Sequence, residues 1–309
     1  MRGTADVILR PPAKAVRDLS RLRRVRLATS GRRLLPAFLV IGAQPTGAMS
    51  LFNALCRHPQ VGGPTPAKED VEWSKELHFF DDNFWRGVDW YRSHFPLSVS
   101  ASIVRRFGRD LVPGEITPSY ILHPAAPERA AATVPEARLI AMLRDPIERA
   151  YAHYDNMKRQ GLEQLSFEDA VAAEEERLAG EEERLRTDER HSSARYRNYG
   201  YVTRGLYADQ LERWLACFPR EQLLVLGAED FVADPGDVFA EAVAFLGLRP
   251  WRPQGFGAAY RLVKPEIEPA GRARLEERFA EPNARLARLV GRDFAWDSAR
   301  HGPETVIPG

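Results

Sequence analysis

Short apolar runs and longer amphipathic runs alternate along this chain. Continuous apolar character over residues 38–41, 138–143 and 222–226 predicts three strands buried on both faces of a parallel sheet. Apolar positions recur with helical spacing over five further segments, residues 50–57, 147–159, 204–217, 238–245 and 271–289. This alternation indicates βαβ units, and the sequence therefore predicts an α/β fold with a doubly wound parallel sheet flanked by helices.

Charged segments flank and interrupt this pattern. Residues 1–36 are predicted to form a basic N-terminal arm that packs on the body of the protein or on a partner, in preference to anchoring in a membrane. Residues 37–297 are expected to form one α/β domain, and residues 298–309 a C-terminal tail. Residues 168–190 are dense in Glu and Arg. They are interpreted either as a solvated helix supported by i,i+4 ion pairs or as a lid over the active site.

The composition narrows the classes of function. The chain has 309 residues, is 44% hydrophobic and carries a formal net charge of +1, so its overall charge gives no support for nucleic-acid binding. No run approaches the roughly 20 apolar residues that cross a bilayer, and no secretion signal is apparent. We therefore expect a cytoplasmic protein without a membrane span. Cys56 and Cys217 make no disulfide framework, and no His/Cys cluster has metal-ligand spacing, so no metal is predicted.

The first predicted strand runs directly into a glycine-bearing turn and a helix, in the sequence FLVIGAQPTGAMSLF over residues 38–52. A loop that closes onto a helix N-terminus offers backbone N–H groups and the positive end of a dipole to an anion. Pro45 within this loop has neither an N–H group nor a charge. The sequence predicts an anion site whose candidate contacts are Gly42, Gln44, Thr46, Gly47 and Ser50.

Further segments follow this loop in a characteristic order. They are SKELHFFD at residues 74–81, EITPSY at 115–120 and LRDPIERAYAHY at 143–154, with additional matching positions between 204 and 230 and between 283 and 296. Together these segments resemble sulfotransferases that use 3′-phosphoadenosine-5′-phosphosulfate (PAPS), in the bacterial and carbohydrate-type branch that includes heparan sulfate sulfotransferases. The resemblance covers about residues 36–297 and implies the P-loop-like sulfotransferase fold. It also implies sulfuryl transfer from PAPS to a hydroxyl or amine of a small-molecule or sugar acceptor.

The resemblance implies roles for particular residues. Glu76, with Lys75 beside it, occupies the position of the catalytic base; the alternative for Glu76 is a surface carboxylate paired with Lys75. His78 is a second candidate, although a structural role is favoured; on an extended segment it would share a face with Glu76.

Two arginines and one lysine are candidate contacts of the 3′-phosphate of the cofactor, and a further arginine is not. Arg144 would bind that phosphate, with a salt bridge to Asp145 or Glu148 as the alternative. Arg149 is expected to be structural. Arg261 and Lys264 fall where related proteins place a basic loop over the phosphate, with a solvated loop as the alternative.

The chain also departs from the family pattern. Pro45 and Ile116 stand where lysines are expected, Ala152 where a serine is expected, and Ala48 and Met49 where two threonines are expected. Losing one charge-assisted donor typically costs on the order of 3–4 kcal/mol in the barrier, or roughly 10²–10³ in rate. Because Pro45, Ala48 and Met49 replace the lysine and threonines of the family pattern, the phosphosulfate loop is degenerate: it lacks the side chains expected to bind the phosphosulfate group.

Three hypotheses follow from this mixture of matches and departures. The first is a working PAPS-dependent sulfotransferase with a remodelled loop. The second is a repurposed fold in which Glu76 and His78 perform acid/base chemistry without PAPS. The third is a non-catalytic binding protein. The sequence leaves the acceptor and the oligomeric state open, a homodimer included. The aromatic residues between positions 73 and 91 are expected to belong mostly to the core and less to an acceptor pocket.

Overall fold

The structure is a computed structural model, and its description covers residues 23–62, 76–106, 110–256 and 265–296. Five parallel strands form one sheet in the order β2-β3-β1-β4-β5. Their bounds are β1 (Phe38–Gly42), β2 (Val61–Gly62), β3 (Val112–Ile116), β4 (Arg138–Leu143) and β5 (Leu223–Gly227). The three predicted strands are confirmed, whereas β2 and β3 were not predicted.

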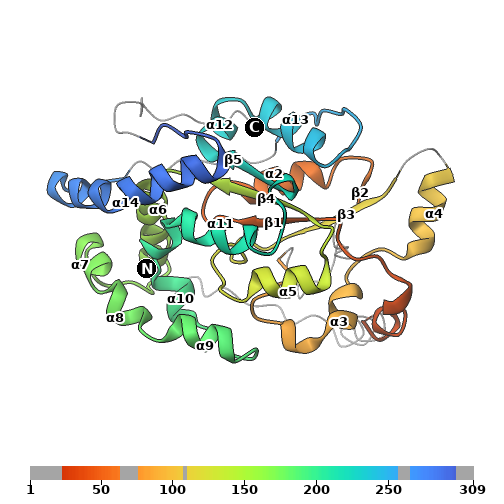
Figure 1. The fold of residues 1–309 in the computed structure, drawn as a ribbon, viewed down its shortest axis with the longest axis horizontal. Helices are drawn as coiled ribbons and strands as arrows, with labels where there is room; N and C mark the ends of the chain where they lie inside the picture. The colour runs from red at the N-terminus through yellow and green to blue at the C-terminus, as the bar shows by residue number, and fades with distance from the viewer. Residues whose placement is uncertain (1–22, 63–75, 107–109, 257–264, 297–309) are drawn as a thin grey trace, which may run out of the picture.

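Helices cover both faces of the sheet, as a doubly wound fold requires (Figure 1). Phe38 and Val40 face a cluster formed with α2 (Ala48–Leu55), α12 (Ala228–Ala233) and α13 (Pro235–Phe245). Leu39 and Ile41 face a second cluster formed with α5 (Ala126–Thr133), α11 (Tyr207–Leu215) and α14 (Pro269–Val290). Successive side chains of a strand point to opposite faces, so a strand that is apolar throughout can contribute to both cores.

Seven further helices complete the described part of the fold. Six of them are α3 (Val88–Arg92), α4 (Ser98–Arg106), α6 (Pro146–Arg159), α7 (Phe167–Ala172), α8 (Glu174–Leu178) and α9 (Glu181–Thr187). To these are added α10 (Ala194–Tyr199) and the 3₁₀ turns η1 (Ser30–Arg32), η2 (Phe84–Arg86), η3 (Thr203–Gly205) and η4 (Arg220–Gln222). The five predicted helices correspond to α2, α6, α11, α13 and α14, with ends shifted by a few residues.

The charged segment 168–190 is not one helix but parts of three short ones, α7, α8 and α9. Gly180, at φ 75°, starts a new helix there because this left-handed backbone conformation ends the preceding turn. The Glu–Arg pair Glu182–Arg186, at 2.8 Å, agrees with the predicted i,i+4 support. Glu174 differs from a solvated surface residue, since its buried carboxylate accepts the Val202 and Thr203 amides.

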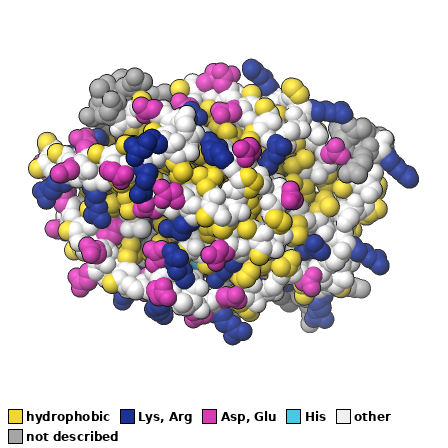
Figure 2. Space-filling model, viewed as in Figure 1, with side chains coloured by type: hydrophobic (Ala, Val, Ile, Leu, Met, Phe, Trp, Pro, Cys, Tyr) yellow, Lys and Arg dark blue, Asp and Glu magenta, His cyan; other side chains and the backbone are white. Residues whose placement is uncertain are grey.

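The described part of the N-terminal arm packs on the body of the protein. The Ser30 hydroxyl donates to Asp89 on α3 at 3.0 Å, and Arg33 donates to the Phe95 carbonyl at 2.7 Å. Among the helices of the described ranges, none combines the length and the apolar character that a membrane crossing needs. Basic and acidic side chains are intermixed over the face drawn in Figure 2, in line with the small net charge.

Candidate active site

The loop between β1 and α2 has a backbone suited to an anion. Gly47 caps α2 in the left-handed region, at φ 88°, where glycine is strongly favoured. Gly42 is required by close packing, because a Cβ there would lie 2.4 Å from Ile121 Cγ2. The first-turn amides of an α-helix generally have no partner within the helix, and the helix dipole favours negative charge beside them. In α2 the Ser50 amide is an exception, because it donates to the Gly47 carbonyl at 2.9 Å. These features of the backbone fit a phosphate group.

The side chains of this loop contribute less than its backbone. Thr46 is buried and its hydroxyl donates to the Ala43 carbonyl at 2.9 Å, so it braces the loop. Gln44 is exposed, and Ser50 is half-buried in the first turn of α2. Arg149 donates to the carbonyls of Gln44, at 3.3 Å, and Tyr201, and so braces the loop. A structural role for this arginine stays a prediction.

Three of the departures from the family pattern are apolar and buried. Ile116 and Ala48 are buried in the cluster that contains α2, and Ala152 is buried on α6. An apolar side chain in such a place donates no hydrogen bond to a ligand. An anion bound here would therefore depend on the loop backbone and on arginines from other elements.

Arg144 lies at the end of β4, where α6 begins. It is fully buried, and its Nη2 lies 3.1 Å from Glu148 Oε2 one helical turn away. The Tyr207 hydroxyl donates to the Arg144 carbonyl at 2.9 Å. The pairing with Glu148 is one of the alternatives that the sequence left open, and a phosphate at Arg144 would share the guanidinium with this carboxylate.

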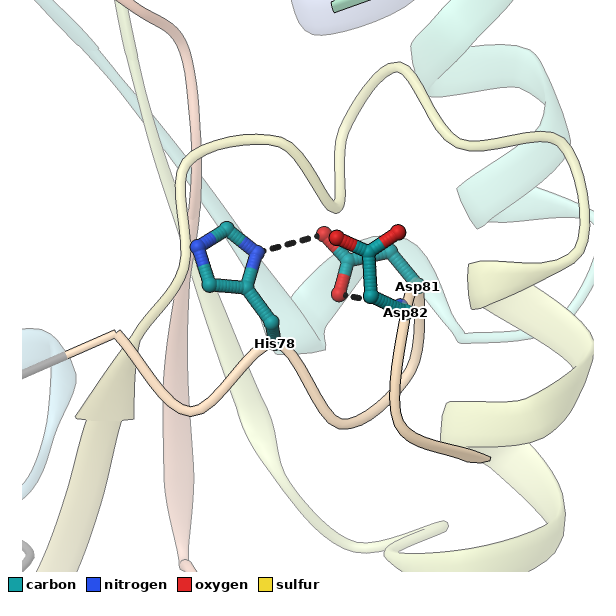
Figure 3. A group of neighbouring side chains, drawn as sticks. All are labelled: His78, Asp81 and Asp82. Atoms are coloured by element: carbon teal, nitrogen blue, oxygen red, sulfur yellow. Dashed lines mark hydrogen bonds and ion pairs between the residues drawn. The ribbon is translucent and has the colours of Figure 1, made fainter. Parts of the chain in front are cut away.

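The predicted base Glu76 belongs to a network of alternating charges. Glu76 Oε2 lies 3.2 Å from His78 Nε2, and His78 Nδ1 lies 2.9 Å from Asp81 Oδ2. The Ser119 hydroxyl donates to the same oxygen of Asp81 at 2.6 Å. Figure 3 shows the His78 ring directed at the Asp81 carboxylate, with Asp82 beside it. The imidazole therefore joins a partly exposed carboxylate, that of Glu76, to the buried carboxylate of Asp81.

This network fixes the charge of the histidine. Burial disfavours the imidazolium, but hydrogen bonds and attraction from Asp81 and Glu76 outweigh burial and raise the pKa of His78 to about 10. Burial likewise opposes ionisation of Asp81, yet its hydrogen bond to His78 brings the pKa of Asp81 below its usual value. Around neutral pH, Asp81 is an anion and His78 a cation.

Hydrogen bonds connect the segment that carries the predicted base (residues 76–81, the base segment) to the carboxyl end of β1. The loop between β1 and α2 (the anion loop) begins at the same end of the sheet. The His78 amide donates to Thr117 Oγ1 at 3.3 Å, and the Thr117 amide donates to the carbonyl of Val40 in β1 at 3.1 Å. The Ile121 amide donates to the Ile41 carbonyl at 2.8 Å. Ligands of open α/β sheets bind outside the carboxyl ends of the strands, which is where these two parts meet.

The family model described as "Sulfotransferase domain" matches residues 35–253 of this chain. The chain belongs to the sulfotransferase family. Over 217 residues it is 34% identical to the human bifunctional heparan sulfate N-deacetylase/N-sulfotransferase 3, an alignment that covers 70% of the chain and 23% of that much longer protein. It is 27% identical to the human heparan sulfate glucosamine 3-O-sulfotransferase 3B1, with coverage of 87% of the chain and 66% of the relative.

A solved structure supports the same assignment. The sulfotransferase from Alicyclobacillus acidocaldarius aligns with a TM-score of 0.63 at 31% identity, covering 85% of this chain and 99% of that one. The sulfotransferase fold predicted from the sequence is thus confirmed.

One group of side chains near the anion loop's end of the sheet has the spacing of metal ligands. His78, Asp81 and Asp82 place possible ligand atoms within 4.8 Å of one another. Both nitrogens of His78 already contact carboxylates, and Asp82 lies 3.5 Å from Arg197. The cationic side chains of His78 and Arg197 account for the clustering of the acidic groups, so the arrangement does not require a metal ion.

A small cavity of about 40 Å³ adjoins the base network. One wall contains His78, Asp81 and Ser119; the other comes from α9 and α10, through Leu185, Ser193, Tyr196 and Arg197. Within the charged segment 168–190, the described lining of this cavity contains Leu185 of α9. A lid function for residues 168–190 stays a prediction.

A larger cavity of about 500 Å³ lies between the start of α6 and α14. Its described lining contains the carboxylates of Asp145, Glu276 and Asp293 and no lysine or arginine, together with the rings of Phe279, Phe294 and Trp296. Two of these carboxylates cap backbone groups, since Asp145 accepts the amides of Ile147 and Glu148 and Asp293 accepts that of Ala295. The described lining thus offers a phosphate group no lysine or arginine side chain.

The structure brings together some predicted residues and not others. Glu76 and His78 meet, and Gly42, Gln44, Thr46, Gly47 and Ser50 form one loop, while Lys75, Arg261 and Lys264 lie outside the described residues. The sequence assigned no role to Asp81 or Ser119, although both stand in the segments that carry the resemblance. Their contacts with His78 depend on a turn at His78, whose φ is 49°.

Proposed function

We propose that this protein transfers a sulfuryl group from PAPS to a hydroxyl or amine of a sugar or small-molecule acceptor. The observation that carries the proposal is the Glu76–His78–Asp81 network at the sheet edge where the anion loop also lies. Such a transfer needs a base beside the acceptor and an anion site for the leaving phosphate.

Glu76 is the base in this proposal. Its carboxylate is about one-quarter exposed, so an acceptor can reach it, whereas Asp81 is buried. Glu76 takes the proton of the acceptor group as that group attacks sulfur. His78 orients Glu76 through Nε2 and is itself held by Asp81 through Nδ1. Lys75 belongs to the same predicted segment.

PAPS, when bound, supplies the sulfuryl group and retains the bond electrons on its 5′-phosphate. The backbone of the β1–α2 loop fits an anion, and Gly47 and the first-turn amides of α2 would hold it. Arg144 would contact the 3′-phosphate in competition with Glu148. Arg261 and Lys264 remain candidates for the same phosphate.

The relatives support a sugar acceptor. Those named above are called heparan sulfate sulfotransferases, one acting on nitrogen and one on the 3-oxygen of glucosamine. This chain spans about a quarter of the length of the first relative, so the acceptor proposed for it is limited to the chemical class of a hydroxyl or amine.

Calorimetric titration with 3′-phosphoadenosine-5′-phosphate (PAP) is the decisive test, followed by assays of PAPS turnover with sugar and small-molecule acceptors. We expect micromolar binding that is weakened in Arg144→Ala, and turnover that is lost in Glu76→Gln. No binding at millimolar PAP would overturn the proposal. Activity that depends on Glu76 without PAPS would then favour the repurposed fold, and insensitivity of every function to Glu76→Gln would favour a binding protein.

A further inference from the structure

A buried carboxyl group lies behind the base network. Glu115, at the end of β3, is fully buried. Two equally buried tyrosines donate to the same oxygen, Glu115 Oε1: Tyr91 at 2.5 Å and Tyr120 at 3.2 Å. A buried carboxyl group is costly unless it is hydrogen-bonded, so an arrangement of this kind constrains all three side chains.

Tyr120 connects this carboxyl group to the base segment. Its hydroxyl accepts the backbone N–H of Phe79 at 2.7 Å while donating its own proton to Glu115. A hydroxyl has one proton, so a fixed acceptor for that proton directs the oxygen lone pairs toward the amide. This hydrogen bond to Glu115 thus helps to orient the hydroxyl that holds Phe79.

Phe79 lies between the residues that must be aligned. It follows His78 directly and precedes Asp81 by two positions, and its ring stacks on Tyr91 with centroids 4.2 Å apart. His78 itself has φ 49°, a region that costs a non-glycine residue roughly 1–2 kcal/mol. Neighbouring contacts must hold such a turn in place, and the first amide after it is the one bound by Tyr120.

We propose that Glu115 is a positioning residue for the base, acting through Tyr120 and the Phe79 amide to keep Glu76, His78 and Asp81 within contact distance. Its effect on rate rests on the proposed function. Its effect on geometry does not, because the charge of His78 reports whether the carboxylates stay in place.

The two tyrosines provide a matched pair of variants. Tyr120→Phe removes the acceptor of the Phe79 amide, whereas Tyr91→Phe removes a hydroxyl from the same carboxyl group and keeps the ring that stacks on Phe79. Burial raises the pKa of Glu115 to about 8 against the lowering effect of the tyrosine hydrogen bonds, so the group is neutral at pH 7. Glu115→Gln is then a conservative variant and Glu115→Leu a disruptive one.

The first measurement is the titration of His78 by nitrogen-edited NMR of the histidine rings. In the unsubstituted protein and in Tyr91→Phe we expect a pKa near 10. In Tyr120→Phe and in Glu115→Leu we expect the pKa of His78 to move toward its ordinary value of 6.5 by about one unit or more. In Glu115→Gln we expect the pKa of His78 to stay close to that of the unsubstituted protein. If Tyr120→Phe does not fold, the same test is made by comparing the pKa of His78 in Glu115→Leu with that in Glu115→Gln.

The second measurement is turnover at saturating PAPS. We expect Tyr120→Phe to lower kcat about tenfold or more and to leave PAP affinity unchanged. The reason is that a small displacement of the base from the acceptor lowers the rate of the chemical step without affecting the nucleotide site. An unchanged pKa of His78 in folded Tyr120→Phe overturns the proposal, as does an equal change in Tyr91→Phe. If neither the unsubstituted protein nor any variant turns over PAPS, that result counts against the proposed function. The titration of His78 then still tests whether Glu115 positions the base segment.

Discussion

Arg144 and Glu148 form a buried ion pair at the start of α6, with 3.1 Å between Nη2 and Oε2. The pair has two consequences for a phosphate ligand. The guanidinium is held in one place, which favours binding, and part of its charge is already neutralised, which opposes it. The balance between these effects can be measured by removing the carboxylate alone.

Glu148→Gln is expected to tighten PAP binding roughly tenfold, because the phosphate no longer shares Arg144 with a carboxylate. The same substitution should lower the free energy of unfolding by about 1–3 kcal/mol, since a buried charged hydrogen bond is lost. Calorimetry and urea denaturation give the two quantities. Glu277→Gln, on the exposed face of α14, is the control. Unchanged PAP affinity in Glu148→Gln would argue that Arg144 does not contact the phosphate.

Glu76→Gln should reduce kcat by about 10²–10⁴-fold, the usual contribution of a general base. PAP affinity should stay the same, because the carboxylate belongs to the acceptor side of the site. Asp81→Asn is expected to have a smaller effect of the same kind, since Asp81 acts through His78. A loss of PAP affinity equal to the loss of rate in Glu76→Gln would point to misfolding of the segment.

Restoring the lysine that the family pattern places in the anion loop should increase activity. Pro45→Lys is expected to raise the rate of sulfuryl transfer by roughly 10²–10³, the value of one charge-assisted donor at the leaving group. Release of PAP from PAPS measures it. The uncharged Pro45→Gln separates the effect of charge from that of replacing proline. Equal rates in the two variants would mean that another cation already occupies the position of the lysine.

Stability should fall with rising pH on account of His78. Its pKa is about 10 in the folded protein, despite burial, because of Asp81 and Glu76, and about 6.5 in an unfolded chain. The folded state therefore holds this proton more tightly, so the contribution is complete below about pH 6.5 and is lost as pH rises toward 10. Urea denaturation across this window should give a smaller decline in His78→Gln. Identical slopes would contradict the assignment.

The edge of the core at β3 offers a test of packing. A Cβ on Gly114 would lie 2.1 Å from the Phe38 ring, which is buried in the neighbouring strand. Gly114→Ala should therefore cost about 1–3 kcal/mol of unfolding free energy. Gly31→Ala, where nothing lies within 4 Å of the added atom, should stay within about 0.5 kcal/mol. Thermal or urea unfolding compares the two variants.

Strands that are apolar throughout could be predicted from the sequence, and strands with other constraints could not. β1, β4 and β5 are nearly continuous apolar runs, which is the pattern of strands buried on both faces. β3 reads VPGEI, and Pro and Gly normally argue against a strand interior. Gly114 is accommodated there because the Phe38 ring fills the space of its missing side chain, a tertiary relationship with no local signal.

The same distinction applies to the candidate site. Glu76 and the loop glycines stand in recognisable motifs, so the sequence could single them out. The pairing of His78 with Asp81 requires a left-handed turn, and the support from Glu115 comes from a strand that was not predicted. The split of the charged segment into three helices likewise depends on Gly180 and on the buried Glu174, which binds the 202–203 turn.

The base segment is anchored through Thr117 to a backbone carbonyl of β1, and the hydrogen-bonding groups of a backbone are the same whatever side chains the next loop carries. The two halves of the site can therefore change at different rates during evolution. Selection on the donor half can alter residues 43–49 while the proton-accepting half keeps its geometry. For protein engineering, this makes the loop an exchangeable cassette: a lysine-bearing loop from a relative could be grafted between β1 and α2 onto an intact base.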